Sequence, residues 1–299
     1  MHRQASLRED TLRWSVQNPE SRMTITATDS IWLAGLILLA CWLLDTSLGR
    51  KALADSPPRR NSMPPYLPLV PMLLWFGGVA IAVVVVQKLT PNLSGWQDLF
   101  RDHIVMSIGA VATIAAMLFL AHFHFARGLK GFGLNVKTIV KDFFMAIFNL
   151  WAIWPLILAA VTVTIFFAKL FSGQDYQMQQ HEQLEMITEY PQLPLRIMIV
   201  FVAIVIAPLL EEMLFRGFVQ TTIRSFINIR NSAWPAIAAS SVFFAIMHAD
   251  PAHWPALFVL GVCLGYSYEK SGSLFRPIFI HLLFNAASVT IVLYESGAS

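Results

Sequence analysis

Charged residues are scarce in this sequence. Asp, Glu, Lys and Arg make up 13% of its 299 residues, about half of the share that is usual in a soluble domain. Hydrophobic residues make up 56%, and the mean hydropathy is +0.59. So much apolar side chain with so little charge excludes an ordinary soluble surface, and the composition therefore predicts a membrane protein.

Cysteine is equally scarce, and several common signals are missing. Cys41 and Cys263 lie in apolar segments without a ligand pattern, so we expect small buried side chains rather than a disulfide or a metal site. No repeat recurs at a fixed period. Residues 1–22 lack the order of charged, apolar and small-residue stretches that a signal peptide requires, so we expect them to be retained.

Long apolar runs are what the sequence does have. Three charge-free segments are long enough to cross the hydrocarbon core of about 30 Å, and four shorter ones follow with polar interruptions: 66–87, 104–126, 143–168, 196–220, 231–248, 254–268 and 277–294. An eighth candidate, 30–44, is near the lower limit for a span, and its crossing stays open. We predict an all-α fold, a polytopic membrane helix bundle with 7–8 transmembrane helices.

We divide the chain into three regions. Residues 1–65 form an N-terminal region with one candidate span at about 30–48, and they end in DSPPRRNSMPP, a run whose prolines prevent a helix. Residues 66–195 hold the N-terminal transmembrane helices and a polar loop. Residues 196–294 hold the membrane core in which the ionisable residues of the spans are concentrated.

The distribution of basic residues predicts the orientation. The loop 127–142 carries four basic residues against Asp142, whereas 172–195 carries four acidic residues and no basic one. By the positive-inside rule the first loop is cytoplasmic and the second is external. Because the basic residues are spread over short loops and form no single patch, we expect the lipid bilayer, and no nucleic acid, as a partner.

Ionisable side chains inside spans are costly, from about 2.5 kcal/mol for one at the bilayer centre, so they mark candidate functional sites. Glu212 and Arg216 are four residues apart on one predicted helix, and this spacing predicts an ion pair. Glu211 is turned by about 100° from its neighbour. It is left to face a polar cavity, where a carboxylate can act as a general base.

Two later segments carry polar pairs with the same spacing. His281 and Asn285 lie on one face of the last segment, while His248 follows Phe244, which we expect to pack. If the intervening turn lies near 228–231, the acidic cluster and His248 are each about 17 residues from it and lie at a similar depth. A carboxylate, two imidazoles and an amide around one cavity can activate water and stabilise an oxyanion.

The three patterns together resemble a known family. Residues 211–217 (EEMLFRG), 244–248 (FAIMH) and 281–285 (HLLFN) resemble the motifs EExxFRG, FxxxH and HxxxN, in the same order. These are motifs of the CPBP family of intramembrane proteases, which is related to the type II CAAX prenyl endopeptidases. The resemblance covers about 196–294, a third of the chain.

The resemblance implies roles for the polar residues. Glu211 would activate the attacking water together with His248, while His281 and Asn285 would bind the water or stabilise the oxyanion. The ion pair beside Glu211 would support this arrangement. The implied reaction is endoproteolysis of a membrane-associated protein or peptide, by a multi-pass protein of a bacterial plasma membrane with its site in the cytoplasmic half. No oligomeric state is predicted.

Metal dependence has two readings. One Glu and two His match the ligand types of catalytic zinc, but the HExxH spacing is missing and Asn is a poor zinc ligand. We therefore favour a glutamate mechanism without a cofactor, and a divalent metal such as zinc is the alternative.

Two other functions remain as alternatives. A noncatalytic membrane partner or immunity-type protein would retain the fold, although the intact set of polar residues in the motifs weighs against it. A proton-coupled transporter would also use intramembrane Glu and His. It would usually show repeated halves with interrupted helices in corresponding positions, and the sequence shows neither.

Overall fold

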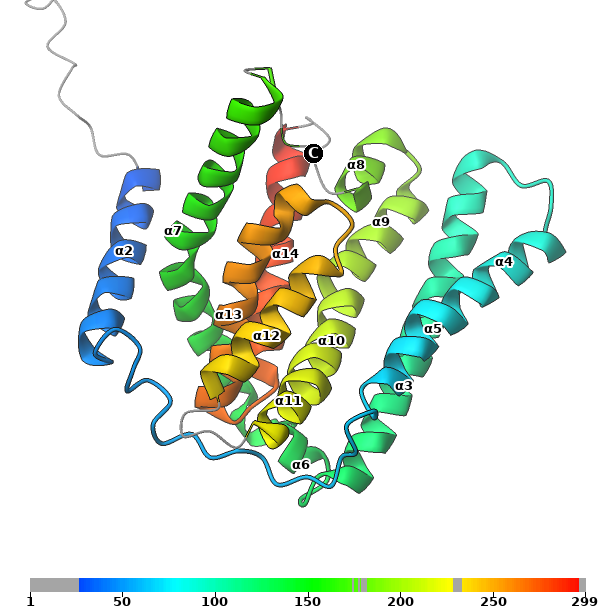
Figure 1. Cartoon of the computed structure of the whole chain (residues 1–299). Coiled ribbons are helices and arrows are strands. Elements are labelled where there is room, and N and C mark those ends of the chain that lie inside the picture. The colour runs from blue at the N-terminus through cyan, green and yellow to red at the C-terminus, as the bar shows by residue number, and fades with distance from the viewer. Residues whose placement is uncertain (1–26, 174, 177, 179–181, 228–232, 296–299) are drawn as a thin grey trace, which may run out of the picture.

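The computed structural model describes residues 27–173, 175, 176, 178, 182–227 and 233–295, and within these residues it is a bundle of helices without a strand (Figure 1). The expectations about residues 1–22 and about a turn near 228–231 fall on residues outside the described part of the chain. The remaining predicted segments can all be compared with helices.

The N-terminal half contains three long helices and several short ones. The helix α5 begins with a capping box, in which Ser94 and Gln97 bond each other's backbone N–H groups. The stretch from Leu69 to Leu89 is continuous, although its middle turn is a π-helix. The elements are α2 (Ala27–Asp45), α3 (Leu69–Met72), η1 (Leu73–Gly78), α4 (Val79–Leu89), α5 (Gly95–His124), α6 (Leu129–Phe132), η2 (Val136–Thr138) and α7 (Ile139–Ser172).

The C-terminal half is built around one long helical stretch, Leu193–Phe226, which alternates between α and π turns. Gly272, with φ +67°, ends α13 in the left-handed region that favours glycine. The elements are α8 (Glu182–Glu189), α9 (Leu193–Phe201), η3 (Val202–Ile206), α10 (Ala207–Glu212), η4 (Met213–Gln220), α11 (Thr221–Phe226), α12 (Ala233–Ile246), η5 (Pro251–His253), α13 (Trp254–Ser271) and α14 (Phe275–Glu295).

The predicted spans coincide with helices. By length and composition, five helical stretches can cross a membrane: Leu69–Leu89, Gly95–His124, Val136–Ser172, Leu193–Phe226 and Phe275–Tyr294. Trp32–Asp45 and Ala233–Ile246 are shorter apolar helices, and α13 covers the remaining predicted segment. The all-α polytopic membrane bundle is therefore confirmed, while the crossing of α2 stays open.

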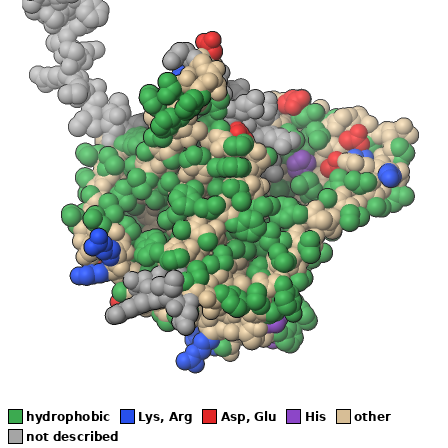
Figure 2. All heavy atoms as spheres, viewed as in Figure 1, with side chains coloured by type: hydrophobic (Ala, Val, Ile, Leu, Met, Phe, Trp, Pro, Cys, Tyr) green, Lys and Arg blue, Asp and Glu red, His purple; other side chains and the backbone are tan. Residues whose placement is uncertain are grey.

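The outside of the bundle is apolar. On the face shown in Figure 2, hydrophobic side chains form a broad middle band, with Lys and Arg mainly at the lower end and Asp and Glu mainly at the upper end. This band includes side chains of α2, which packs against α7. Cys41 is exposed on α2, so the expectation that both cysteines are buried is wrong for this one, and only Cys263 is buried. The error arises because an apolar segment in a membrane protein exposes one face to lipid.

The core of the bundle lies around its central helices, and an aromatic contact with α6 contributes to it. In Figure 1, the helices α10 to α14 lie in the middle, with α2 and α7 on one side and α4 and α5 on the other. The ring of Phe132 lies against Gly217, where an added Cβ would come within 2.3 Å of the ring. Phe132 also contacts Phe218, and both are fully buried. The glycine of the EExxFRG pattern thus admits an aromatic ring from α6 to the long central stretch.

The segment between α2 and α3 (residues 46–68), here called the connector, runs along the lower end of the bundle (Figure 1). It contains no helix, as its prolines predict. Asn61 forms an antiparallel bridge with Phe125, at the end of α5. The backbone N–H of Ser62 donates to His124, and Arg60 accepts from Ala126. The connector is therefore fixed to the ends of the helices that it crosses.

Candidate active site

The two adjacent glutamates of α10 lie in different environments. Glu212 is fully buried, and its Oε2 lies 3.2 Å from Nε of Arg216, which is also fully buried. The ion pair predicted from their spacing is therefore present. The side chain of Glu211 is 25% exposed. Of the two carboxylates, Glu211 is the one that a substrate or a water molecule can approach.

His281 of α14 lies between the two carboxylates. Its Nδ1 is 3.0 Å from Oε1 of Glu212, and its Nε2 is 3.9 Å from Oε2 of Glu211. An ionised carboxylate only accepts hydrogen bonds, so Nδ1 carries the hydrogen and donates it to Glu212. Neutral His281 then has its lone pair on Nε2, the nitrogen that faces Glu211.

Phe244 of α12 connects the site residues. Its ring centroid is 5.7 Å from that of His281 and 5.0 Å from that of His248. The guanidinium carbon of Arg216 lies 4.6 Å from the same centroid, which is the distance of a cation–π contact. Packing was expected of Phe244, and the structure shows that its partners are the polar residues of the other motifs.

His248 lies just past the end of α12, where the chain bends. Its Nδ1 is 2.9 Å from the carbonyl oxygen of Phe244, which can only accept a hydrogen bond. This contact fixes the tautomer with the hydrogen on Nδ1. The indole Nε1 of Trp254 donates to the carbonyl of His248 at 2.9 Å. His248 is thus held at the end of α12 through its ring by Phe244 and through its backbone carbonyl by Trp254.

Asn285 is held by a carbonyl that the backbone leaves unbonded. Its Nδ2 donates to the oxygen of Ala203 at 2.7 Å. In an α turn that oxygen would accept from Ala207, but the N–H of Ala207 donates to Val202 instead. In a π turn it would accept from Pro208, which has no N–H. The proline before the acidic cluster therefore explains both the π turn η3 and the orientation of Asn285.

The structure thus brings most of the expected site residues to one place. Glu211, Glu212, Arg216 and His281 are joined by direct contacts, and His248 reaches them through the ring of Phe244. His281 and Asn285 both face the long central stretch, as their four-residue spacing predicts. The contribution of Ala203 was missed, and Pro208 was its signal in the sequence.

Several buried polar atoms of this group have no hydrogen-bond partner among the described residues. They are Oε2 of Glu211, Oε2 of Glu212, and Nε and Nη1 of Arg216. Buried polar atoms usually bond to protein or to ordered water. Oε2 of Glu212 and Nε of Arg216 face each other in the ion pair, so Oε2 of Glu211 and Nη1 of Arg216 are the atoms left for a water molecule.

The His and Glu side chains of the site can be compared with the ligand set of a catalytic zinc ion. Among the described residues, no group of three His, Cys, Asp or Glu side chains is arranged to hold a metal. The oxygens of Glu212 face Arg216 and His281, and a zinc site in an enzyme ordinarily needs three protein ligands.

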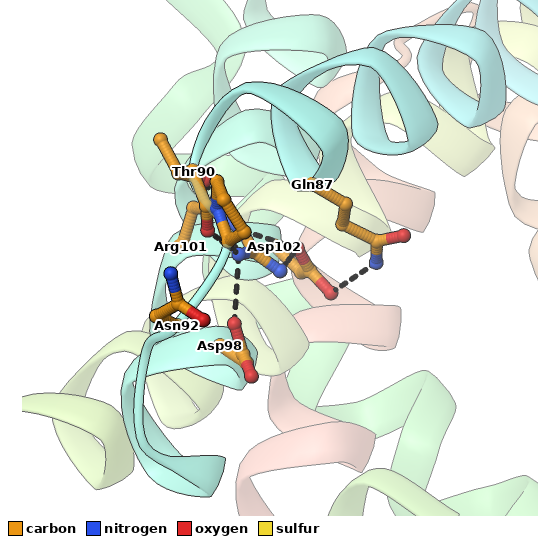
Figure 3. Close-up of a pocket in the computed structure, with 7 residues that line it drawn as sticks. Gln87, Thr90, Asn92, Asp98, Arg101 and Asp102 are labelled. Carbon is orange, nitrogen blue, oxygen red and sulfur yellow. Dashed lines mark hydrogen bonds and ion pairs between the residues drawn. The ribbon is translucent and has the colours of Figure 1, made fainter.

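A separate polar pocket of about 330 Å³ lies at the turn between α4 and α5, far along the chain from these residues (Figure 3). Arg101 binds Asp98 at 2.7 Å and Asp102 at 2.9 Å, and Gln87 also donates to Asp102. The pocket shares no residue with the site above, and its charged groups are paired with each other. We assign no function to it.

Comparison with known proteins supports the resemblance drawn from the motifs. Residues 193–287 match the family described as Rce1-like, the type II CAAX prenyl endopeptidase Rce1-like family. This match includes α9 to α13 and the first half of α14, and hence every residue of the candidate site. The resemblance to the CPBP family is confirmed over this part of the chain.

Two curated proteins are similar over about half of the chain. One, named "Putative membrane peptidase YdiL", is from Bacillus subtilis (strain 168) and is 25% identical over 161 residues. The other, named "Membrane-embedded CAAX protease MroQ", is from Staphylococcus aureus (strain USA300) and is 30% identical over 153 residues. The matches cover 54% and 50% of this chain and 58% and 60% of the respective relatives. No solved structure matches the chain with significant similarity.

The apolar helices and these relatives agree that the chain is an integral membrane protein. The site lies within the matched segment, but the relatives are matched over less than two thirds of their own length.

Proposed function

We propose that this protein is a membrane-embedded endopeptidase that cleaves a peptide bond of a membrane-associated protein or peptide. The observation that carries the proposal is the position of His281, whose Nε2 lies 3.9 Å from Oε2 of the partly exposed Glu211. The two atoms are close enough to contact one water molecule. The family match and the names of both relatives support the same reaction class.

In the proposed reaction, Glu211 is the general base. It takes a proton from the water, assisted by His248, while the water oxygen attacks the carbonyl carbon of the scissile bond. The tetrahedral intermediate then breaks its C–N bond, and the proton held by Glu211 passes to the leaving amine. The products are a new carboxylate and a new amine, so atoms and charges balance.

His281 is assigned to the attacking water and Asn285 to the developing oxyanion. Nδ1 of His281 donates to Glu212, so the lone pair on Nε2 of the neutral ring accepts a hydrogen bond from the water placed beside Glu211. Asn285 has a second N–H besides the one that donates to Ala203, and this N–H is the proposed oxyanion donor.

A mechanism without a metal is proposed for the same site. Glu212 is engaged by Arg216 and His281, which leaves Glu211 and the two histidines without the arrangement that zinc requires. Protein charges then have to stabilise the oxyanion in place of a Lewis acid.

The proposed setting is the plasma membrane of a bacterium, with the site in the cytoplasmic half. The substrate would reach the site from the bilayer, because apolar side chains cover the outside of the bundle (Figure 2). No nucleic acid is needed as a partner.

The test is reconstitution of the protein in vesicles with a library of lipidated and unlipidated membrane peptides, followed by mass spectrometry of the products. We expect cleavage by the wild type and none by Glu211→Ala, His248→Ala or His281→Ala. The control is Glu189→Ala, which changes an exposed carboxylate outside the site. Cleavage that persists in Glu211→Ala would refute the mechanism. Activity that a chelator removes and zinc restores would refute the metal-free version.

A further inference from the structure

One face of the central helical stretch carries a row of buried polar side chains. Glu212, Arg216, Gln220 and Arg224 follow one another at intervals of four residues. Their relative exposures are 0%, 0%, 0% and 6%. Buried polar groups in a membrane protein persist when other helices satisfy them, and they mark functional positions. The motifs explain the first two residues of the row but neither Gln220 nor Arg224.

The last three side chains of the row, those of Arg216, Gln220 and Arg224, are bound by α13. Arg216 Nη2 donates to the carbonyl of Gly261 at 3.2 Å, and Gln220 Nε2 donates to the carbonyl of Gly265, also at 3.2 Å. Gln220 further donates to Oε1 of Glu269 at 3.0 Å, and Arg224 forms an ion pair with Oε2 of the same carboxylate. The partners on α13 thus recur at the same four-residue interval as the side chains that they bind.

Two glycines fix the alignment of the helices. A Cβ added to Gly265 would lie 2.6 Å from Oε1 of Gln220, and one added to Gly261 would lie 2.9 Å from Cβ of Ser241. The helices therefore pack closely at these two glycines, and Gly265 provides the space for Gln220. A shift of α13 along the central stretch would break its contacts with Arg216, Gln220 and Arg224 together.

The row ends at the connector. Arg224 Nη2 donates to the carbonyl of Ser56, and Ser56 Oγ donates to the carbonyl of Glu269 at 2.8 Å. Arg59 lies 3.7 Å from Oε2 of Glu269 and donates to the carbonyl of Tyr268 at 3.0 Å. Contacts therefore join the connector to Glu269, and Glu269 to Gln220 and Arg224 of the same helical stretch that carries Glu212.

The stretch between the two ends is a π-helix. The element η4 runs from Met213 to Gln220. π turns are rare in proteins, but those that occur are often found at functional sites. Such a stretch depends on tertiary contacts for its alignment. Glu212 stands directly before η4, and Gln220 is its last residue. The hold of α13 on Gln220 and Arg224 therefore sets where Arg216 and Glu212 stand relative to His281.

We propose that Gln220, Arg224 and Glu269 are positioning residues of the active site, which hold Glu212 against His281 and link the site to the connector. The role rests on the proposed function, since it concerns the same imidazole. The three residues touch neither water nor substrate. Their loss is expected to slow the chemical step because a displacement of about 1 Å in a catalytic group can reduce the rate about a hundredfold.

The kinetic test uses Gln220→Leu, which keeps the volume but removes both hydrogen bonds. We expect kcat to fall about ten- to a hundredfold, with KM unchanged. The matched control is Asn149→Leu. Asn149 of α7 donates to Ser267 of α13 at 3.0 Å, and so it is also a polar tether of α13, but it is outside the row. Equal effects of the two substitutions would overturn the proposal.

A second measurement does not depend on proteolysis. With ¹⁵N-labelled histidine, the His281 signal, identified by its loss in His281→Gln, reports which ring nitrogen carries the hydrogen. We expect an Nδ1–H form in the wild type and in Asn149→Leu, and a mixture of tautomers in Gln220→Leu. An unchanged His281 signal in Gln220→Leu would refute the positioning role. Absence of cleavage by the wild type would refute only the proposed function.

A variant in the connector serves as the control for a folding defect. Arg59→Met keeps an apolar stem and removes the contacts to Glu269 and Tyr268 from the partly buried connector. It is measured in parallel by both methods and by thermal unfolding in detergent. We expect a smaller change in the same direction as for Gln220→Leu. If Gln220→Leu does not fold, an Arg59→Met protein with wild-type kcat and an unchanged His281 signal overturns the proposal.

Discussion

Nδ1 of His281 lies 3.0 Å from Oε1 of Glu212, and the other oxygen of that carboxylate lies 3.2 Å from Nε of Arg216. One buried carboxylate therefore serves an imidazole and a guanidinium, while its neighbour Glu211 is 25% exposed. The two glutamates are adjacent in the sequence but have different roles in the structure. Glu212 organises the site, and Glu211 is the carboxylate accessible to reactants.

The first prediction separates the two carboxylates by stability. Glu212→Gln leaves Arg216 buried without its counter-ion, and we expect the free energy of unfolding to fall by about 3–5 kcal/mol. Glu211→Gln removes a partly exposed charge whose Oε2 has no hydrogen-bond partner among the described residues, so we expect a change below about 1 kcal/mol. Reversible unfolding in mixed micelles measures both. A reversed order would show that Glu211 bears the structural role.

The second prediction concerns Gly217. An added Cβ would lie 2.3 Å from ring carbons of Phe132, so Gly217→Ala has to displace a fully buried ring, and overpacking of this kind costs about 1–3 kcal/mol. Gly77→Ala is the matched control, because this helical glycine has nothing within 4 Å of its Cβ position. We expect the melting temperature to drop for Gly217→Ala alone. Similar melting temperatures for both variants would contradict the packing described above.

A third prediction tests the link between Asn285 and Pro208. Asn285→Ala leaves the carbonyl of Ala203 without a donor, which costs about 1–3 kcal/mol for a buried polar group. Pro208→Ala supplies a new backbone N–H within reach of that carbonyl in a π turn. The double variant is therefore expected to lose less stability than the sum of the single changes. Strict additivity in this double-mutant cycle would show that the two residues act independently.

The fourth prediction addresses a buried pair that anchors α14 to α7. Arg276 binds Oδ1 of Asp142 through Nε at 3.0 Å and through Nη2 at 2.9 Å. Asp142→Leu leaves the guanidinium unpaired, so we expect a loss of about 3–5 kcal/mol. Adding Arg276→Met removes the uncompensated charge, and part of the loss should return in the same unfolding assay. No recovery would mean that Asp142 acts through other contacts.

The fifth prediction is topological. The positive-inside rule places Lys137 in the cytoplasm and Glu189 outside, and both side chains are exposed. In a Cys41→Ser background, a membrane-impermeant thiol reagent added to intact cells is expected to label Glu189→Cys. It is expected to label Lys137→Cys only after the membrane is opened. Labelling of Lys137→Cys in intact cells would invert the orientation and move the site to the external half.

Local patterns predicted the helices and the ion pair between Glu212 and Arg216, because both depend on neighbours within one or two turns. Contacts between distant segments left a weaker trace. Gln220 has an ordinary position in the sequence, and only the arrival of Gly265 and Glu269 some 45 and 49 residues later reveals its partners. The π turns were not predicted either, although Pro208 removes the N–H that an α turn needs.

The exposure of side chains within the apolar helices could not be predicted from the sequence either. An apolar helix in a membrane has no polar face to mark the outside, so Cys41 could not be distinguished from Cys263 by its surroundings in the chain. The same ambiguity leaves open whether α2 crosses the membrane, because its 19 residues are close to the minimum for a span.

The connector has a consequence for the order in which this protein assembles. Its bonds from Arg59, Ser56 and Ala52 lead to residues 209, 213 and 218 positions later in the chain. During synthesis the N-terminal helices are therefore translated before Tyr268, Glu269 and Lys270, the residues of α13 that bind the connector. Contacts of such long range form late, so a nascent chain that stops before α13 can dock residues 60–62 of its connector against the end of α5 but leaves the part from Ala52 to Arg59 undocked and exposed to quality-control proteases.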